Sequence, residues 1–343
     1  MPNKVNLDQM SEEDLLKVRI CDLPVRIAET WLAECIQRLY EELEAKGIVF
    51  RPECYLTDEW LTPENQPIIG IPFFLAHPAL IRLEKKMMLE AEGETVTACM
   101  QLLRHETGHA ICYAYQLNRR SKFRQLFGSS KKAYSETYRY RPYSKSFVRH
   151  LEGFYAQYHP DEDFVETFAV WLTPGLDWAK QYQGWPALRK LQYIDELMRH
   201  IKAREPRIKK GKKFWQAKTI KASLATFYRR RRKLRAEDFP DFHDNNLKRI
   251  FSPAGQDAPS VLAADFLRRH RPKIVQEISL WTGEKKYVIN DLLRHIIQRC
   301  GALRLAVGEP EHIVMVRFIS YITTLVMNYV YTGWYRGDHR VRK

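Results

Sequence analysis

The sequence predicts an α+β fold that is followed by an all-α C-terminal domain. Runs of β-forming residues with prolines occur only near residues 47–89, and long stretches of helical periodicity follow them. A strongly basic stretch at residues 203–235 then separates two halves of different composition. The chain has 343 residues, which is enough for two domains. We therefore expect domains at residues 1–202 and 236–343, joined by a basic linker or arm.

The first part of the N-terminal domain is expected to hold one helix and a small β-sheet. Residues 11–46 have apolar positions at three-and-four spacing and end before Gly47, which predicts a helix. Residues 47–57 and 67–78 are rich in β-formers and prolines, which predicts strands or extended segments. The apolar residues of 79–89 predict a third strand.

Three helices are expected before the basic stretch, at residues 93–117, 160–172 and 185–201. Pro160 and the acids behind it favour a helix N-terminus, because proline fits the first helical position and acids complement the helix dipole. Residues 118–150 have few aliphatic side chains and many tyrosines. This composition predicts a long, partly irregular segment, and such segments are often functional.

The C-terminal domain is expected to be helical, with helices near residues 259–269, 285–300 and 311–333. The last of these is apolar over a length that fits a membrane span. However, Arg317 and Asn328 interrupt it, and a charge near the bilayer centre costs about 3 kcal/mol. The sequence thus favours a buried core helix, and no integral membrane span is expected.

Positive charge is concentrated in two segments. The chain has a net charge of +15, of which residues 202–235 hold +14 and residues 119–150 hold +9, so the remainder is acidic. Such segments indicate an anionic partner or substrate, although solvated loops share this pattern. Because residues 202–235 mix charge with aromatics, nucleic-acid or acidic-partner binding is an alternative function, and peripheral membrane binding is another.

The cysteines and the N-terminus favour a cytoplasmic location. The six cysteines are scattered without a CxxC pair, which is typical of reduced thiols rather than a disulfide framework. The N-terminus is polar and acidic, and a signal peptide would need a basic region followed by an apolar one.

The run HETGH at residues 105–109 is the strongest motif in the chain. On a helix, His105 and His109 are one turn apart and lie on one face, so both imidazoles can reach one metal ion. Glu106 can act as a general base over the same metal, which is the arrangement that the H-E-x-x-H spacing gives zinc peptidases. A purely structural zinc site would not need such a base.

A catalytic zinc ion needs a third protein ligand, and the helix expected at 160–172 supplies two candidates. Glu162 and Glu166 are four residues apart and lie on the same face of this helix. One of them could ligate zinc while the other accepts the outer N–H of a ligating histidine. The spacing alone leaves both assignments open.

Together, HETGH and the later run EDFVETFAVWL resemble the bacterial zinc-binding metallopeptidases of the gluzincin type, and more distantly the lethal-factor branch. The resemblance covers about residues 45–200. It implies a zincin-like metallopeptidase domain that binds Zn²⁺ and hydrolyses peptide bonds with a metal-activated water. The peptide or protein substrate would be acidic if the basic segment at 119–150 borders the cleft.

The resemblance also implies roles for individual residues. In the lethal-factor branch the first acid of the ligand helix binds the metal and the second orients a histidine, which makes Glu162 the ligand and Glu166 its supporting residue. Reading the second acid as the ligand would promote Glu166 instead. A tyrosine seven residues before the ligand steadies the oxyanion in that branch; here this position is Tyr155, with Tyr158 as a near alternative.

Overall fold

The computed structural model describes residues 6–134, 141, 143–233, 243–254 and 261–332. The chain divides into two compact units. The first contains nearly all described residues up to Tyr228, and the second contains those from Arg229 onward together with a short piece at 88–90.

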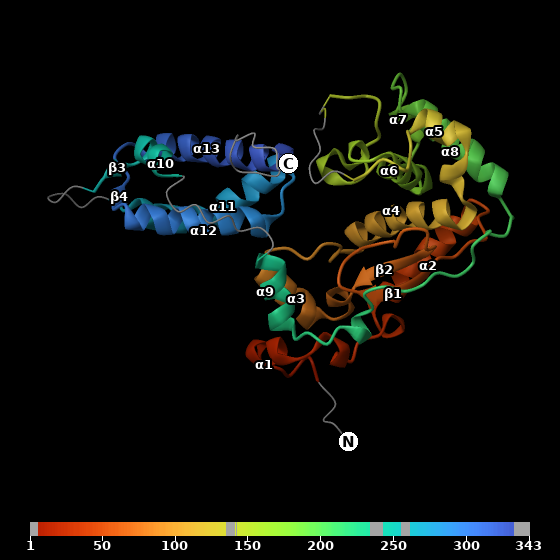
Figure 1. Cartoon of the computed structure of the whole chain (residues 1–343), viewed down its shortest axis with the longest axis horizontal. Helices are drawn as coiled ribbons and strands as arrows, with labels where there is room; N and C mark the ends of the chain where they lie inside the picture. Colours follow the sequence, from red (N-terminus) through yellow and green to blue (C-terminus); the bar gives the residue numbers. More distant parts are fainter. Residues whose placement is uncertain (1–5, 135–140, 142, 234–242, 255–260, 333–343) are drawn as a thin grey trace. The chain divides into compact units, whose positions relative to one another are not determined.

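The structure is mixed α/β, mostly helical with a small sheet (Figure 1). Up to residue 233, its helices and strands are α1 (Glu12–Lys17), α2 (Trp31–Ala45), β1 (Glu53–Thr57), β2 (Ile68–Pro72), α3 (Pro78–Met88), α4 (Val96–Tyr115), α5 (Ser121–Leu126), α6 (Pro160–Leu172), α7 (Trp178–Gln181), α8 (Leu188–Ile201) and α9 (Leu224–Lys233).

The single helix expected at residues 11–46 was a wrong prediction, because two helices occupy this range. Helix α1 ends at Lys17, and α2 begins only at Trp31. Pro24 lies between them, where a missing N–H and a fixed φ prevent a continuous helix. The side chain of Thr30 then accepts a hydrogen bond from the Leu32 N–H and caps the start of α2.

The small sheet consists of two parallel strands, β1 and β2. All five residues of β2 are buried, which is typical of a parallel strand that is covered on both faces. The third strand expected at 79–89 was a wrong prediction, since these residues form most of helix α3. Leu80, Leu83 and Met88 are buried at helical spacing, and Pro78 occupies the first helical position.

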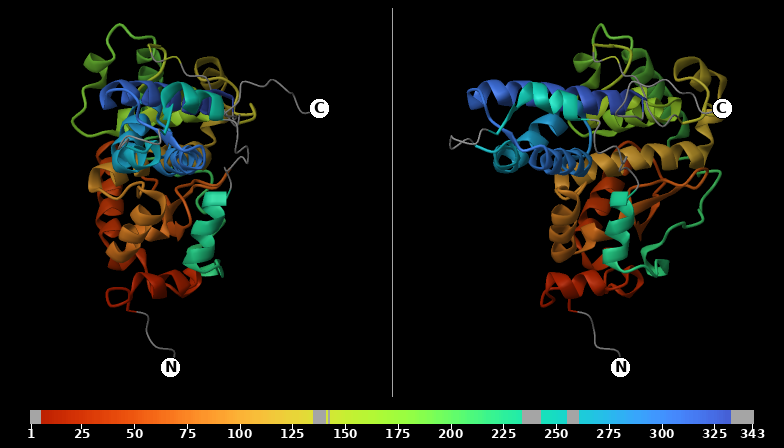
Figure 2. Two further views of the ribbon diagram at one scale, coloured as in Figure 1. Left: turned by 90° about the vertical axis from the view of Figure 1, so that its left-hand side faces the viewer. Right: turned by 60° about the vertical axis from the view of Figure 1, so that its left-hand side comes forward.

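Two helices place the candidate site, and both were predicted. Helix α4 begins after Thr95, whose side chain accepts from the Ala98 N–H, and it ends where Gln116 takes a left-handed conformation. Helix α6 covers the predicted range 160–172, with His159 as its N-cap and Pro160 in its first turn. The two helices pack against each other and lie side by side in every view (Figures 1 and 2).

The basic stretch at 203–235 differs from a free linker over most of its length. Compact packing of the first unit extends to Tyr228 instead of ending at residue 202. Leu224 and Tyr228 are fully buried, and Gln216 forms a β-bridge with Thr57. The stretch follows the first unit because its apolar residues have a core to enter, while its lysines and arginines stay at the surface. Residues 234–235 lie outside the described ranges, as do 135–140 and 142 of the other basic segment.

The second unit is a helical assembly with its own hydrophobic core. Its three long helices lie side by side in both figures (Figures 1 and 2). Two short strands of two residues each pair antiparallel beside them. The elements are α10 (Asp244–Ile250), β3 (Ser252–Pro253), α11 (Ala263–Thr282), α12 (Lys286–Ala302), β4 (Leu305–Ala306) and α13 (Glu311–Thr332).

Within the described residues, helix α13 buries one face in the core of the second unit. Val314, Phe318 and Ile322 are fully buried in the core of the second unit, as a core helix requires. Val316 on another face is 64% exposed. Of the apolar stretch Glu311–Val330, 28% is buried. Within the described ranges, Glu311–Val330 is the one stretch that is long and apolar enough to span a membrane by length and composition alone.

Candidate metal centre

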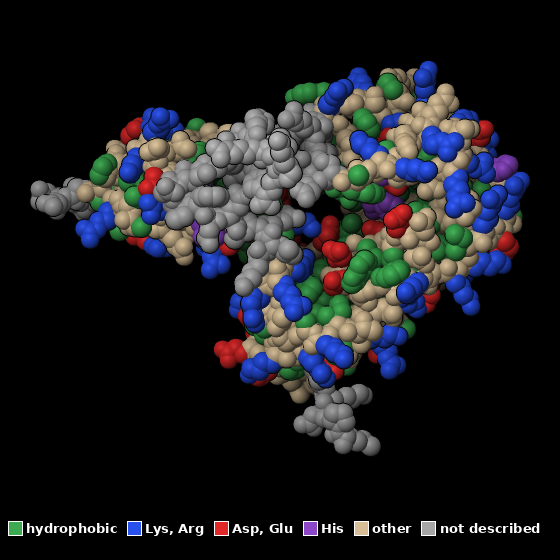
Figure 3. Space-filling model, in the orientation of Figure 1, with side chains coloured by type: hydrophobic (Ala, Val, Ile, Leu, Met, Phe, Trp, Pro, Cys, Tyr) green, Lys and Arg blue, Asp and Glu red, His purple; other side chains and the backbone are tan. Residues whose placement is uncertain are grey.

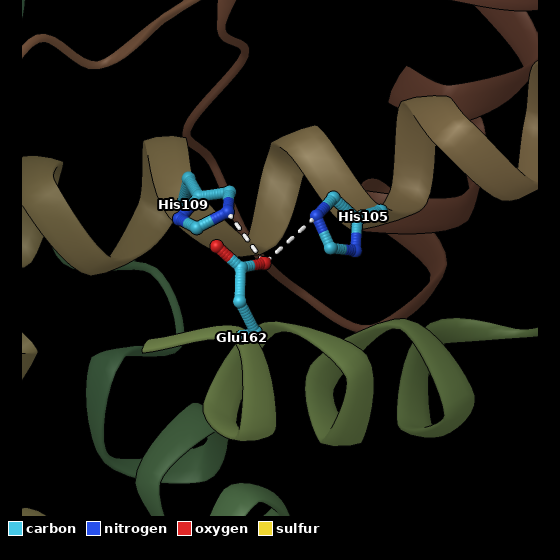
Figure 4. Close-up of side chains that lie close together, drawn as sticks. All are labelled: His105, His109 and Glu162. Atoms are coloured by element: carbon cyan, nitrogen blue, oxygen red, sulfur yellow. Dashed lines mark ion pairs between the residues drawn. The ribbon is translucent and has the colours of Figure 1, made fainter. Parts of the chain in front are cut away.

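Two histidines of α4 point toward α6 in the first unit (Figure 4). His105 and His109 are one helical turn apart, and their ring centroids are 5.2 Å apart. The ring of His105 is buried, and that of His109 is nearly so. Their Nε2 atoms both face the same carboxylate oxygen, which belongs to Glu162 of α6.

Glu162 meets both histidines through one atom. Its Oε2 lies 3.2 Å from Nε2 of His105 and 3.3 Å from Nε2 of His109. These three side chains form the one group of metal-ligating type found among the described residues, with their candidate ligand atoms within 4.8 Å of one another. Two ligand atoms of a tetrahedral zinc ion with bonds of about 2.0–2.1 Å are about 3.3 Å apart, so the observed separations suit such an ion.

Glu166 contacts the other side of the His105 ring. Its Oε1 lies 2.8 Å from Nδ1 of His105, and its Oε2 accepts from the Leu151 N–H at 2.8 Å. Nδ1–H therefore donates to Glu166, and Nε2 is left to face Glu162. Of the two glutamates that the sequence left open, Glu162 is the one placed at both Nε2 atoms, and Glu166 is placed to orient His105.

The site holds more buried negative charge than its histidines can balance. Glu106, Glu162 and Glu166 are all buried beside two imidazoles. Among the described residues, no hydrogen-bond partner reaches Oε2 of Glu106 or Oε2 of Glu162. Buried charges are costly unless they are paired or coordinate a metal. A divalent cation between His105, His109 and Glu162 would supply the missing charge, so this donor set fits zinc.

The pKa values reflect this crowding of charge. Burial alone lowers the pKa of His105, but its close contacts with the carboxylates of Glu162 and Glu166 outweigh it and raise that pKa to about 10. Burial raises the pKa of Glu162, but His109 and His105 outweigh it and hold that pKa well below its usual range. Burial also raises the pKa of Glu106, with the two histidines opposing the effect. A carboxylate with a raised pKa is suited to accept a proton near neutral pH.

Tyr155 is placed beside the histidines by a short 3₁₀ helix (Glu152–Gln157). Its ring centroid lies 5.5 Å from that of His105. The alternative tyrosine is Tyr158. Its ring centroid lies 5.7 Å from that of Tyr155 and 5.6 Å from that of Tyr134. Burial raises the pKa of Tyr155 well above its ordinary value, so its phenol stays protonated and can donate a hydrogen bond.

The surface around this region is uneven in charge. In the space-filling view, acidic and hydrophobic side chains flank a hollow of the first unit in which histidine is visible (Figure 3). Lys and Arg side chains are spread over the outer surface around it (Figure 3).

Sequence reasoning missed three contacts that support the site. The phenol of Tyr134 donates to Oε1 of Glu162 at 2.8 Å. Arg104 donates twice to Glu42 of α2, at 2.7 Å each, in a buried ion pair. Thr62 donates from its hydroxyl to the backbone carbonyl of Glu106. Tyr134 lies in a tyrosine-rich segment whose composition gave no sign of which tyrosine would reach the site.

Comparisons with known proteins support the zinc site through one match. Neither the curated proteins nor the solved structures contain a match to this chain. Residues 79–197 match the family model described as "Putative zinc-binding metallo-peptidase". This segment is about a third of the chain and includes both α4 and α6. The part of the chain that carries His105, His109 and Glu162 is thus similar to a zinc-binding metallopeptidase family.

Proposed function

We propose that this protein is a zinc-dependent metallopeptidase that hydrolyses peptide bonds. The observation that carries the proposal is the position of Glu162 Oε2, 3.2 Å and 3.3 Å from the Nε2 atoms of His105 and His109. The match of residues 79–197 to a zinc-binding metallopeptidase family supports it. This set of two histidines and one glutamate is a known catalytic zinc set, which leaves a position free for water.

His105, His109 and Glu162 would hold the zinc ion. Glu166 would keep His105 in the tautomer that leaves Nε2 free for the metal. When bound, zinc supplies a Lewis acid for the scissile carbonyl and for water.

Glu106 is the proposed general base. It takes a proton from the attacking water while the new carbon–oxygen bond forms. It then delivers this proton to the leaving amine as the carbon–nitrogen bond breaks. The raised pKa of Glu106 suits both transfers. Tyr155, beside His105, would donate its phenolic hydrogen to the developing oxyanion of the substrate.

Acidic peptides are the proposed substrate class. Part of the basic segment 119–150 lies against the start of α6, where Ser130 contacts Asp161 and Tyr134 contacts Glu162. The neighbouring Lys131 and Lys132 are exposed. Positive charge on the surface attracts anionic chains, and the attraction weakens as salt is added.

The test combines zinc quantification with cleavage of a peptide library that includes acidic sequences. Wild-type protein should hold one zinc ion per chain and cleave peptides. Glu106→Gln should retain the zinc and lose roughly 10²–10⁴-fold in kcat/KM. His109→Ala should lose the zinc itself.

Two outcomes contradict the proposal. If Glu106→Gln cleaves as fast as the wild type, the assigned base is wrong. If the wild type binds zinc tightly but cleaves no library peptide, the metal has a structural role instead.

A further inference from the structure

The two oxygens of Glu162 have different surroundings. Oε2 faces the Nε2 atoms of His105 and His109, and no hydrogen-bond partner reaches it among the described residues. Oε1 accepts a hydrogen bond from the phenol of Tyr134 at 2.8 Å. The carboxylate is therefore held with one particular oxygen toward the histidines.

Tyr134 is itself held in place by His159. The two rings are stacked, with centroids 3.9 Å apart and an interplanar angle of 17°. Nδ1 of His159 accepts from the Asp161 N–H at 3.1 Å, so the proton of the neutral ring is on Nε2. Nε2–H then donates to the carbonyl of Lys132 at 2.7 Å. His159 is buried and bonded on both sides, so it is a fixed platform for the tyrosine.

The chain that carries Tyr134 is fastened to the start of α6 at several points. Lys132 accepts from His159, and Ser130 donates from its hydroxyl to the carboxylate of Asp161. His159 is the N-cap of α6, and Asp161 and Glu162 belong to its first turn. A segment far from α6 in sequence terms is thereby tied to the turn that presents Glu162.

We propose that Tyr134 is a positioning residue that makes Glu162 a one-oxygen zinc ligand. A free carboxylate can rotate and can bind a metal through either oxygen or through both. A hydrogen bond to Oε1 fixes the rotation and leaves Oε2 for the metal. Glu166 acts on His105 in the same way, by bonding the atom that faces away from the metal. This inference rests on the proposed zinc site.

The experiment compares Tyr134→Phe with Tyr143→Phe as a matched control. Phenylalanine at position 134 keeps the ring for stacking on His159 and removes only the hydroxyl. Tyr143 belongs to the same basic segment and is 93% exposed, so its hydroxyl has no role in the site. The primary readout is the zinc dissociation constant, measured by competition with a chromogenic chelator. Circular dichroism of the metal-free proteins checks that the fold is unchanged.

Zinc affinity should fall at least about tenfold in Tyr134→Phe and stay unchanged in Tyr143→Phe, since groups that support metal ligands typically contribute about 10–100-fold. Tyr134→Ala should lose at least as much, because it also removes the stacked ring. Wild-type zinc affinity in Tyr134→Phe overturns the proposal. So does a gain of peptidase activity in that variant, since the phenol would then be a lid that blocks the site.

Failure of the proposed function can be told apart from failure of this inference. The zinc measurement needs no substrate, so a wild type that binds zinc but cleaves nothing still tests Tyr134. A wild type that binds no zinc refutes the zinc site itself, and the role of Tyr134 with it.

Discussion

Gly108 of α4 lies directly against Val165 of α6. A Cβ built on Gly108 would be 3.0 Å from both Cα and Cγ1 of Val165, which is closer than side-chain contacts normally are. Gly108 is one residue before His109 on the histidine helix, and Val165 is three residues after Glu162 on the glutamate helix. The close approach of the two helices at this point brings Glu162 within reach of both histidines.

Gly108→Ala should therefore weaken both folding and zinc binding. Alanine is the better helix former by about 1 kcal/mol, but overpacking against backbone costs about 1–3 kcal/mol. We expect a net loss of stability and a lower zinc affinity, measured by denaturant unfolding and chelator competition. The control is Gly301→Ala, a helical glycine whose Cβ would meet only Ala264, at 4.0 Å. If Gly108→Ala is stabilised as much as this control, the close packing does not constrain the site.

Glu166→Gln should lower zinc affinity although the side chain keeps its size. Both groups that face Glu166, the Nδ1–H of His105 and the N–H of Leu151, are donors. An amide offers one oxygen, so one donor would face the NH₂ group. We expect zinc affinity to fall about 10–100-fold in a chelator competition assay. The exposed Glu196→Gln should not change it, and an equal effect in both variants would refute the orienting role of Glu166.

Arg104→Met should be strongly destabilising. The pair of Arg104 and Glu42 joins α4 to α2 through two 2.7 Å hydrogen bonds, and both side chains are buried. Removing the arginine leaves the buried carboxylate of Glu42 with the largely exposed Arg38, whose Nε lies 3.6 Å from Oε1 of Glu42. We expect the free energy of unfolding to fall by about 3–5 kcal/mol. The double variant Glu42→Met, Arg104→Met should recover much of this loss in denaturant unfolding. A double variant as unstable as the single one would mean that packing, not charge, explains the effect.

Acid should weaken the second unit through His243. Burial lowers the pKa of this histidine to about 4, and its Nδ1 lies 2.8 Å from the hydroxyl of Tyr321. The unfolded chain has an ordinary histidine pKa of about 6.5, so it takes up the proton first as the pH falls. The contribution of His243 is thus fully present above pH 6.5 and is lost between about pH 6.5 and pH 4.

Denaturant unfolding of the whole chain at several pH values tests this prediction. The free energy of unfolding of the second unit should fall with pH in this window, and His243→Gln should make the fall less steep. The glutamine cannot be protonated but can still bond the Tyr321 hydroxyl. An unchanged slope in that variant would assign the acid sensitivity to other groups.

Local sequence patterns were enough to place the two helices that matter most. The periodicity and end signals of α4 and α6 lie within the helices themselves, so they can be read without knowing the fold. The range 79–89 shows where this fails, since its apolar residues suit a strand by type and a helix by spacing. The break in 11–46 was missed because the helical spacing resumes after Pro24.

By itself, the sequence determined that His105 and His109 share a helix face and that Glu162 and Glu166 share another, because the helical repeat fixes which residues face together. Only the tertiary structure decided which glutamate meets both Nε2 atoms, since that depends on how closely α6 approaches α4 at Gly108. It also decided that Tyr134 reaches Glu162 and that Glu42 pairs with Arg104. These partners are 28 and 62 residues apart, and no local repeat connects side chains over such distances in the chain.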